Sequence, residues 1–137
     1  MNILVSSDKN YLDITATMLY SLYIHNKEKI NVWFLNKSIS HIDKEKFTNY
    51  LYEKCKIKVF FIDIDESIFN SLTTPLYIKH ISIETYFRLI AQFLLPPNVE
   101  RILWLDSDII VKGSLKDFYY QTIDSLSMVA CENMGEA

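Results

Sequence analysis

Short apolar runs alternate with amphipathic segments along this chain, and this alternation limits the fold more strongly than any other feature. Short apolar runs predict buried strands, whereas apolar residues at helical spacing predict helices that cover a sheet. The predicted strands are residues 2–6, 30–35, 57–62 and 101–105, and the predicted helices are residues 11–25, 40–54 and 84–95. The order of these elements predicts an α/β fold, with a mostly parallel sheet and helices on both faces.

Some weaker local signals complete this expectation. Ser40 predicts the N-cap of helix 40–54, because Asp43 follows it three residues later. Two consecutive prolines after residue 95 end the preceding helix. We also expect a short helix near residues 66–72 and short strands at residues 109–112 and 127–131. Ligands of parallel sheets bind at the carboxyl ends of the strands, so the polar residues that follow strands 2–6 and 101–105 are the candidate site.

The composition excludes several classes of function. The chain has 137 residues, of which 50% are hydrophobic and 23% are charged, and this suits one folded domain better than a disordered segment. It contains two glycines, so it cannot build a glycine-rich phosphate loop. The net charge is -3 and the basic residues are scattered, which argues against nucleic acid as a partner.

The two cysteines lie far apart and lack the spacing of a metal site, so we expect a reducing, cytoplasmic location. The first residues lack the basic segment and the long apolar core of a secretory signal. Every apolar stretch is much shorter than the roughly 20 residues that a membrane helix needs.

The feature with the most chemical content is the pair Asp106 and Asp108, which follows the apolar strand 101–105 directly. In an extended segment, residues two apart point to the same side, so we expect the two carboxylates to face one another. A hard divalent ion such as Mg²⁺ or Mn²⁺ would relieve their repulsion and could hold a diphosphate. The alternative is that both residues serve only as turn residues or as a helix cap.

A second polar group, residues 6–11, follows the first predicted strand. Asp8 and Asn10 could form hydrogen bonds with a base or ribose, and Tyr11 could stack on a base. The alternative is that Asp8 or Asn10 simply caps the next helix. In the third group, Arg88 offers a rigid fork of donors that suits phosphate or sugar hydroxyls, or it could form a surface ion pair. The nearby His80 is interpreted as structural.

These three groups of residues give the chain a resemblance to the family 8 glycosyltransferases. The resemblance runs along essentially the whole chain, from Ser-Ser-Asp-Lys-Asn-Tyr at residues 6–11, through His-Ile-Ser-Ile-Glu-Thr-Tyr-Phe-Arg-Leu at residues 80–89, to Leu-Asp-Ser-Asp at residues 105–108. It implies a Rossmann-like domain of the GT-A type. It also implies transfer of a hexose from UDP-glucose or UDP-galactose, with retention of anomeric configuration and with Mn²⁺ (or Mg²⁺). The acceptor would be a saccharide or lipopolysaccharide-type molecule.

The resemblance also assigns roles to individual residues. Asp106 and Asp108 would bind the metal, and Arg88 would contact the donor sugar or diphosphate as a catalytic and substrate-binding group. Glu132 would be the acidic residue near the donor sugar, and it is assigned as catalytic. The substrate-binding residues would further include Ser6, Asp8, Asn10 and Tyr11 at the uracil and ribose, Ile81 and Ile83 along the nucleotide pocket, and Ser107.

Members of the family place a third metal ligand, a His, a diphosphate-binding Lys and most of the acceptor site in a later portion. We therefore expect residues 1–137 to be the nucleotide-sugar-binding portion of a single GT-A domain, without the acceptor-binding portion. We also expect self-association through uncovered apolar surface. A peripheral membrane contact made by that later portion is a further expectation.

Two other functions compete with glycosyl transfer. A phosphotransferase of the haloacid dehalogenase type also has Asp-x-Asp after an apolar strand, but Gly-Thr usually follows that pair, whereas Ile109 and Ile110 follow it here. The stronger competitor is a non-catalytic module that binds a nucleotide sugar or a partner protein without turnover.

Overall fold

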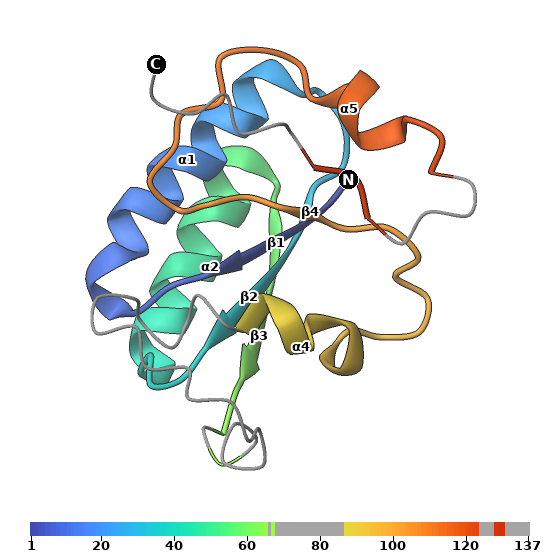
Figure 1. Ribbon diagram of the computed structural model, residues 1–137. Helices are drawn as coiled ribbons and strands as arrows, with labels where there is room; N and C mark the ends of the chain where they lie inside the picture. Colours follow the sequence, from blue (N-terminus) through green and yellow to red (C-terminus); the bar gives the residue numbers. More distant parts are fainter. Residues whose placement is uncertain (66, 68–86, 124–127, 131–137) are drawn as a thin grey trace, which may run out of the picture.

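The computed structural model describes residues 1–65, 67, 87–123 and 128–130 (Figure 1). The elements along the chain are β1 (Asn2–Ser6), the 3₁₀ helix η1 (Lys9–Tyr11), α1 (Leu12–His25), β2 (Asn31–Asn36), α2 (His41–Cys55), β3 (Lys58–Asp63), α4 (Phe87–Leu94), β4 (Leu103–Trp104) and α5 (Lys116–Tyr120).

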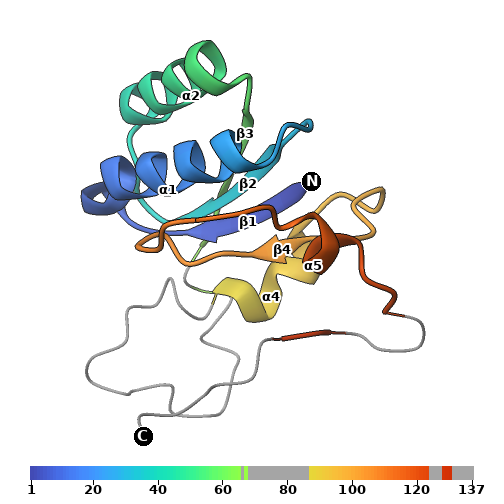
Figure 2. The same cartoon turned by 90° about the horizontal axis from the view of Figure 1, so that it is seen from above.

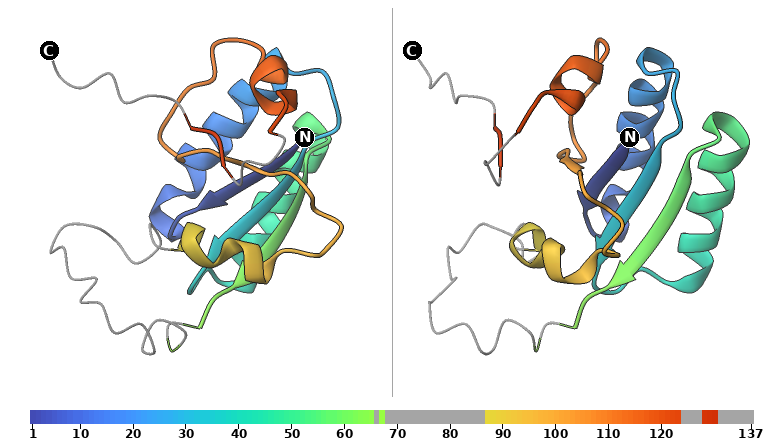
Figure 3. Two further views of the ribbon diagram at one scale, coloured as in Figure 1. Left: turned by 45° about the vertical axis from the view of Figure 1, so that its right-hand side comes forward. Right: turned by 90° about the vertical axis from the view of Figure 1, so that its right-hand side faces the viewer.

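The strands form one parallel sheet in the order β3-β2-β1-β4. Helices α1 and α2 cover one face and α4 lies on the other, as Figure 2 and Figure 3 show from different directions. The predicted α/β fold is confirmed. Of the described residues, no helix is both long enough and apolar enough to span the hydrocarbon layer of a membrane.

Alternating side chains of the strands divide the core into two layers. Ile3 and Val5 of β1 are fully buried in the larger cluster, which contains Met18 and Leu22 of α1. Leu4, which lies between them in the sequence, belongs to a smaller cluster with Phe87 of α4. Successive residues of a strand point to opposite faces, so each strand supplies apolar side chains to both layers.

The predicted cap of α2 is confirmed. The Ser40 hydroxyl accepts a hydrogen bond from the Asp43 amide at 3.1 Å and donates one to the Asp43 carboxylate at 2.7 Å. An N-cap side chain satisfies one of the amide groups that have no partner within the helix. The hydrogen bond from Ser40 also lowers the pKa of the Asp43 carboxyl group below its ordinary value.

The strand predicted at residues 109–112 is wrong, because this segment forms no strand. The buried Val111 amide donates instead to the Ser21 hydroxyl of α1 at 2.9 Å. A few residues later, the Leu115 amide donates to the side-chain oxygen of Asn26 at 2.8 Å. Side chains in α1 and at its C-cap therefore satisfy the Val111 and Leu115 amides in place of sheet hydrogen bonds.

The last predicted strands also need correction. The expected strand 101–105 is reduced to Leu103–Trp104, although the Leu105 amide still donates to the Leu4 carbonyl at 3.1 Å. Residues 128–130, the described part of the predicted strand 127–131, are not in a strand. Helix 84–95 is confirmed where it is described, from Phe87 to Leu94. The helix expected near residues 66–72 lies outside the described residues, apart from Ser67.

Candidate functional site

The sheet register brings the ends of β1 and β4 together. These strands are parallel neighbours, with Ile3 opposite Leu103 and Leu4 opposite Trp104. The residues that follow β1 and those that follow β4 therefore lie at the same edge of the sheet. This is the carboxyl edge, where parallel sheets bind their ligands. The expectation that the two polar groups share one edge is met.

Hydrogen bonds within residues 7–15 shape the turn that follows β1. The Asp8 carboxylate accepts from the Asn10 amide at 2.7 Å, so Asp8 caps η1 as the simpler alternative predicted. The buried Ser7 hydroxyl lies 3.4 Å from that of Thr15, which donates to the Tyr11 carbonyl at 2.8 Å. Asn10 and Tyr11 are exposed, and Asp8 is half-buried. Capping uses one oxygen of Asp8 and leaves the other available for a ligand.

The Asp-Ser-Asp segment is a turn rather than the expected extension of the strand, since residues 107 and 108 lie in a turn. The alternation rule for extended chains therefore does not apply to Asp106 and Asp108. Both carboxylate residues are exposed, while Ser107 between them is only 7% exposed. Burial of the middle residue thus leaves the two carboxylates on the surface at the carboxyl edge.

The Ser107 hydroxyl is unusual among the described residues. It is a buried side-chain oxygen without a hydrogen-bond partner in that part of the chain. An unpaired buried hydroxyl costs free energy, about 1–3 kcal/mol, and such groups in native proteins call for an explanation. A polar ligand at this edge would supply one.

Trp104 joins two of the predicted site residues. Its indole N–H donates to the Asp106 carboxylate at 3.0 Å. The Arg88 guanidinium carbon lies 5.7 Å from the centre of the same ring. The structure therefore brings Arg88 of α4 and Asp106 together through a residue that sequence reasoning missed. An aromatic residue two positions before the first Asp was the only available signal.

The other predicted site residues are not described. Ile81, Ile83 and Glu132, together with His80, lie outside the described residues. The remaining histidines, His25 and His41, lie on α1 and α2 as expected.

The donor atoms at the carboxyl edge suit a hard divalent cation in kind but not in number. Asp106 and Asp108 offer carboxylate oxygens, which Mg²⁺ and Mn²⁺ prefer. The described residues hold no group of three or more His, Cys, Asp or Glu side chains that could bind a metal ion. These residues could hold an ion only if a diphosphate, water or other protein groups completed its coordination.

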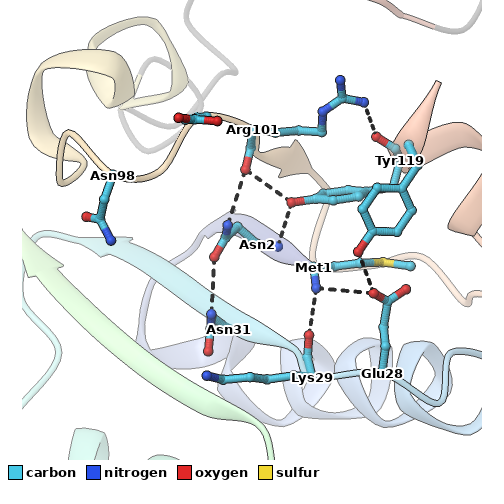
Figure 4. A pocket seen from close by; sticks show the side chains of 10 residues that line it. Met1, Asn2, Glu28, Lys29, Asn31, Asn98, Arg101 and Tyr119 are labelled. Carbon is cyan, nitrogen blue, oxygen red and sulfur yellow. Dashed lines mark hydrogen bonds and ion pairs between the residues drawn. The ribbon is translucent and has the colours of Figure 1, made fainter. Parts of the chain in front are cut away.

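A polar pocket of about 520 Å³ lies at the opposite, amino edge of the sheet (Figure 4). The Tyr119 hydroxyl accepts from the Asn2 amide at 2.9 Å and donates to the Arg101 carbonyl at 3.1 Å. The Tyr120 hydroxyl donates to Glu28 at 2.6 Å, and this bond raises the pKa of Tyr120. These polar groups already form hydrogen bonds with one another. We therefore interpret the pocket as a structural joint between β1, the segment before β4 and α5, and not as a ligand site.

The chain matches a known protein family over almost its whole length. The model of the family described as Glycosyl transferase family 8 matches residues 2–136. The chain therefore belongs to glycosyltransferase family 8, as its motifs indicated.

Individual relatives agree with that assignment. A protein of Haemophilus influenzae named as a candidate glycosyltransferase is 31% identical over 134 residues, which cover 97% of this chain and 39% of that protein. The glycosyltransferase GlyF of Streptococcus pneumoniae is 28% identical over 133 residues, covering 97% of this chain and 32% of that protein. This chain thus spans less than half the length of these relatives.

A solved structure shows the same fold. The galactosyltransferase LgtC, crystallised with donor and acceptor sugar analogues, superposes with a TM-score of 0.77 at 26% identity. The match covers 90% of this chain and 44% of that chain. The fold is therefore that of the GT-A glycosyltransferases.

Proposed function

We propose that this chain binds a UDP-sugar at the carboxyl edge of its sheet, as the donor-binding part of a retaining hexosyltransferase. One observation carries the proposal: the register of β1 with β4 places residues 6–11 and the Asp106–Asp108 turn at one edge, and Trp104 connects Arg88 to that turn. Family membership supports glycosyl transfer, and the likeness to LgtC supports a sugar donor and a sugar acceptor.

The proposed roles follow from chemistry and position. The exposed carboxylates of Asp106 and Asp108 would hold Mn²⁺ or Mg²⁺. When bound, this ion would neutralise charge that develops on the departing diphosphate. Arg88 would attract the diphosphate or contact the donor sugar through its guanidinium group. Ser107 would gain a partner for its buried hydroxyl from the ribose or diphosphate.

The turn after β1 would bind the nucleoside. Asn10 and Tyr11 are exposed, so their side chains can meet a base, and Ser6 and Asp8 would contact the base or ribose. Ile81, Ile83 and Glu132 keep the roles that the resemblance implies for them, as part of the same proposal.

In the proposed reaction, the bond between the anomeric carbon and the diphosphate oxygen breaks and UDP leaves. A hydroxyl oxygen of a saccharide acceptor forms the new bond on the same face of the sugar, and its proton passes to the departing diphosphate oxygen. The choice of glucose or galactose, the lipopolysaccharide-type acceptor and the cytoplasmic location stay predictions. The chain spans less than half the length of these relatives. Sugar transfer by this chain is therefore part of the proposal.

A second function is favoured by one observation. The described part of the chain offers two carboxylates at this edge and no larger group of metal ligands. The second candidate is therefore a module that uses these two carboxylates to bind a nucleotide sugar and does not transfer it. Hydrolysis or transfer of the sugar by the purified chain distinguishes an enzyme from such a module.

Calorimetric titration with UDP tests the donor site, with Mn²⁺ present or absent. We expect Mn²⁺-dependent binding that disappears in the Asp106→Ala/Asp108→Ala variant. The matched control is Glu53→Ala/Asp117→Ala, which removes the same charge from exposed positions on α2 and α5 and should bind as the unmodified chain does. A folded sample that binds no UDP under either condition would contradict the proposal.

A further inference from the structure

Trp104 has a rigid ring and a polar edge that points to the candidate site. Its ring is partly buried against the smaller core cluster, which contains Leu4, Leu35 and Phe87. Its indole N–H donates to the exposed carboxylate of Asp106 at 3.0 Å. A side chain that is packed on one side has little freedom, so its N–H group is a fixed donor.

The same ring also contacts a cation. The Arg88 guanidinium carbon lies 5.7 Å from the ring centre, within the distance at which a cation is attracted to an indole face. Phe87, the preceding residue on α4, is fully buried in the cluster against which Trp104 packs. The core therefore fixes both the ring and the backbone that carries Arg88.

An exposed Asp side chain can rotate freely, and binding an ion through it costs that freedom. A hydrogen bond to one carboxylate oxygen restricts the rotation and leaves the second oxygen for the ion. Groups that orient metal ligands in this way commonly alter metal affinity by about 10- to 100-fold. The bond from Trp104 to Asp106 has the geometry for this effect.

We propose that Trp104 is a positioning residue that sets Asp106 for a divalent cation and Arg88 for the anionic part of the donor. This inference rests on the proposed function, because it assumes that Asp106 and Asp108 bind an ion. One side chain would then couple the metal site on the β4 turn to the cationic group on α4.

The test compares Trp104→Phe with Trp33→Phe. The first variant keeps an aromatic ring beneath Arg88 but removes the N–H donor. The second removes the other Trp of the chain, whose N–H donates at 3.4 Å to Asn2 near the amino edge. Binding of Mn²⁺, first alone and then with UDP present, is followed through the electron paramagnetic resonance signal of the free ion.

We expect Trp104→Phe to weaken Mn²⁺ binding by about tenfold or more, with a melting temperature near that of the unmodified chain. Trp33→Phe should bind Mn²⁺ normally. In that variant Trp104 is the remaining Trp, so Mn²⁺ should quench its fluorescence with the dissociation constant of the resonance titration. Mg²⁺, which is not paramagnetic, should quench much less. This measurement keeps the inference testable even if Trp104→Phe does not fold.

A further variant, Trp104→Leu, removes the ring as well as the donor. At saturating Mn²⁺ we expect it to bind UDP about two- to fivefold more weakly than Trp104→Phe, because Arg88 loses its ring contact.

The outcomes separate the two proposals. If the unmodified chain binds no Mn²⁺ even with UDP, the proposed function fails. If it binds Mn²⁺ through Asp106 and Asp108 but Trp104→Phe binds equally well, only the positioning role is overturned. Absence of quenching by bound Mn²⁺ in Trp33→Phe would also overturn it.

Discussion

Replacing Tyr119 by Phe should destabilise the joint that holds the amino end of β4. The Tyr119 side chain is 7% exposed, and its hydroxyl bridges the Asn2 amide at 2.9 Å and the Arg101 carbonyl at 3.1 Å. The Arg101 carbonyl keeps a second partner, the Asn2 side-chain amide at 3.4 Å. The main loss in Tyr119→Phe is therefore the acceptor of the Asn2 backbone amide.

A buried amide without an acceptor costs about 1–3 kcal/mol. The adjoining pocket of about 520 Å³ is polar and can admit water to this amide. We therefore expect Tyr119→Phe to lower the free energy of unfolding by about 1–2 kcal/mol, the lower part of that range. The Arg101 side chain also donates to the main-chain carbonyls of Tyr119 and Gln121, and these bonds remain in the variant, which further limits the loss.

Urea denaturation measures this loss as a shift in midpoint at constant slope. Tyr120→Phe is the matched control, because it also removes one hydroxyl, but from a side chain that is 51% exposed. Its bond to Glu28 is a surface contact, so the control should change stability by less than about 0.5 kcal/mol. Equal stability of the two variants would refute the view that the Tyr119 bridge holds the joint.

Two other predictions concern the cap of α2 and a buried thiol. Ser40→Ala should lower stability by about 1 kcal/mol in thermal or urea denaturation. Ser40 lowers the pKa of Asp43 in the folded chain. The contribution of Asp43 to the free energy of unfolding is therefore present above the ordinary Asp pKa and disappears as the pH falls through the folded pKa. Ser40→Ala should reduce this loss of stability at acid pH, and an unchanged acid profile would contradict the assignment. Burial raises the pKa of the Cys55 thiol. In the Cys131→Ser variant, in which Cys55 is the one remaining cysteine, this thiol should react with a disulfide reagent far more slowly in the native chain than after denaturation. Equal rates would show that the thiol is accessible in the native chain.

The sequence was sufficient to predict the first part of the fold. In residues 2–63 the spacing of apolar residues distinguishes strands from helices clearly. Each element predicted there appears within about two residues of its expected ends. The Ser40–Asp43 cap was also predictable, since both partners lie within one turn of helix. The shared edge of residues 6–11 and Asp106 followed from the rule that parallel strands align their carboxyl ends.

The remaining features depend on contacts between distant residues. Residues 109–112 have the composition of a strand, but the Ser21 hydroxyl accepts the Val111 amide, and tertiary contacts override local preference. Helix α5 has only five residues and was not predicted, although Ser114 precedes it and its hydroxyl accepts a hydrogen bond from the Lys116 amide at 3.2 Å. The contacts of Trp104 depend on the direction of its ring, which sequence spacing does not give.

The account predicts where a metal–nucleotide complex binds, and paramagnetic broadening of amide resonances tests this most directly. With UDP present, Mn²⁺ should first broaden the amides of residues 6–11 and 105–108, at the carboxyl edge. The amides of Asn2, Arg101 and Tyr119, beside the pocket at the amino edge, should broaden only at higher ratios of Mn²⁺ to protein. Broadening centred on the amino edge, or no broadening in either region, would contradict the central claim.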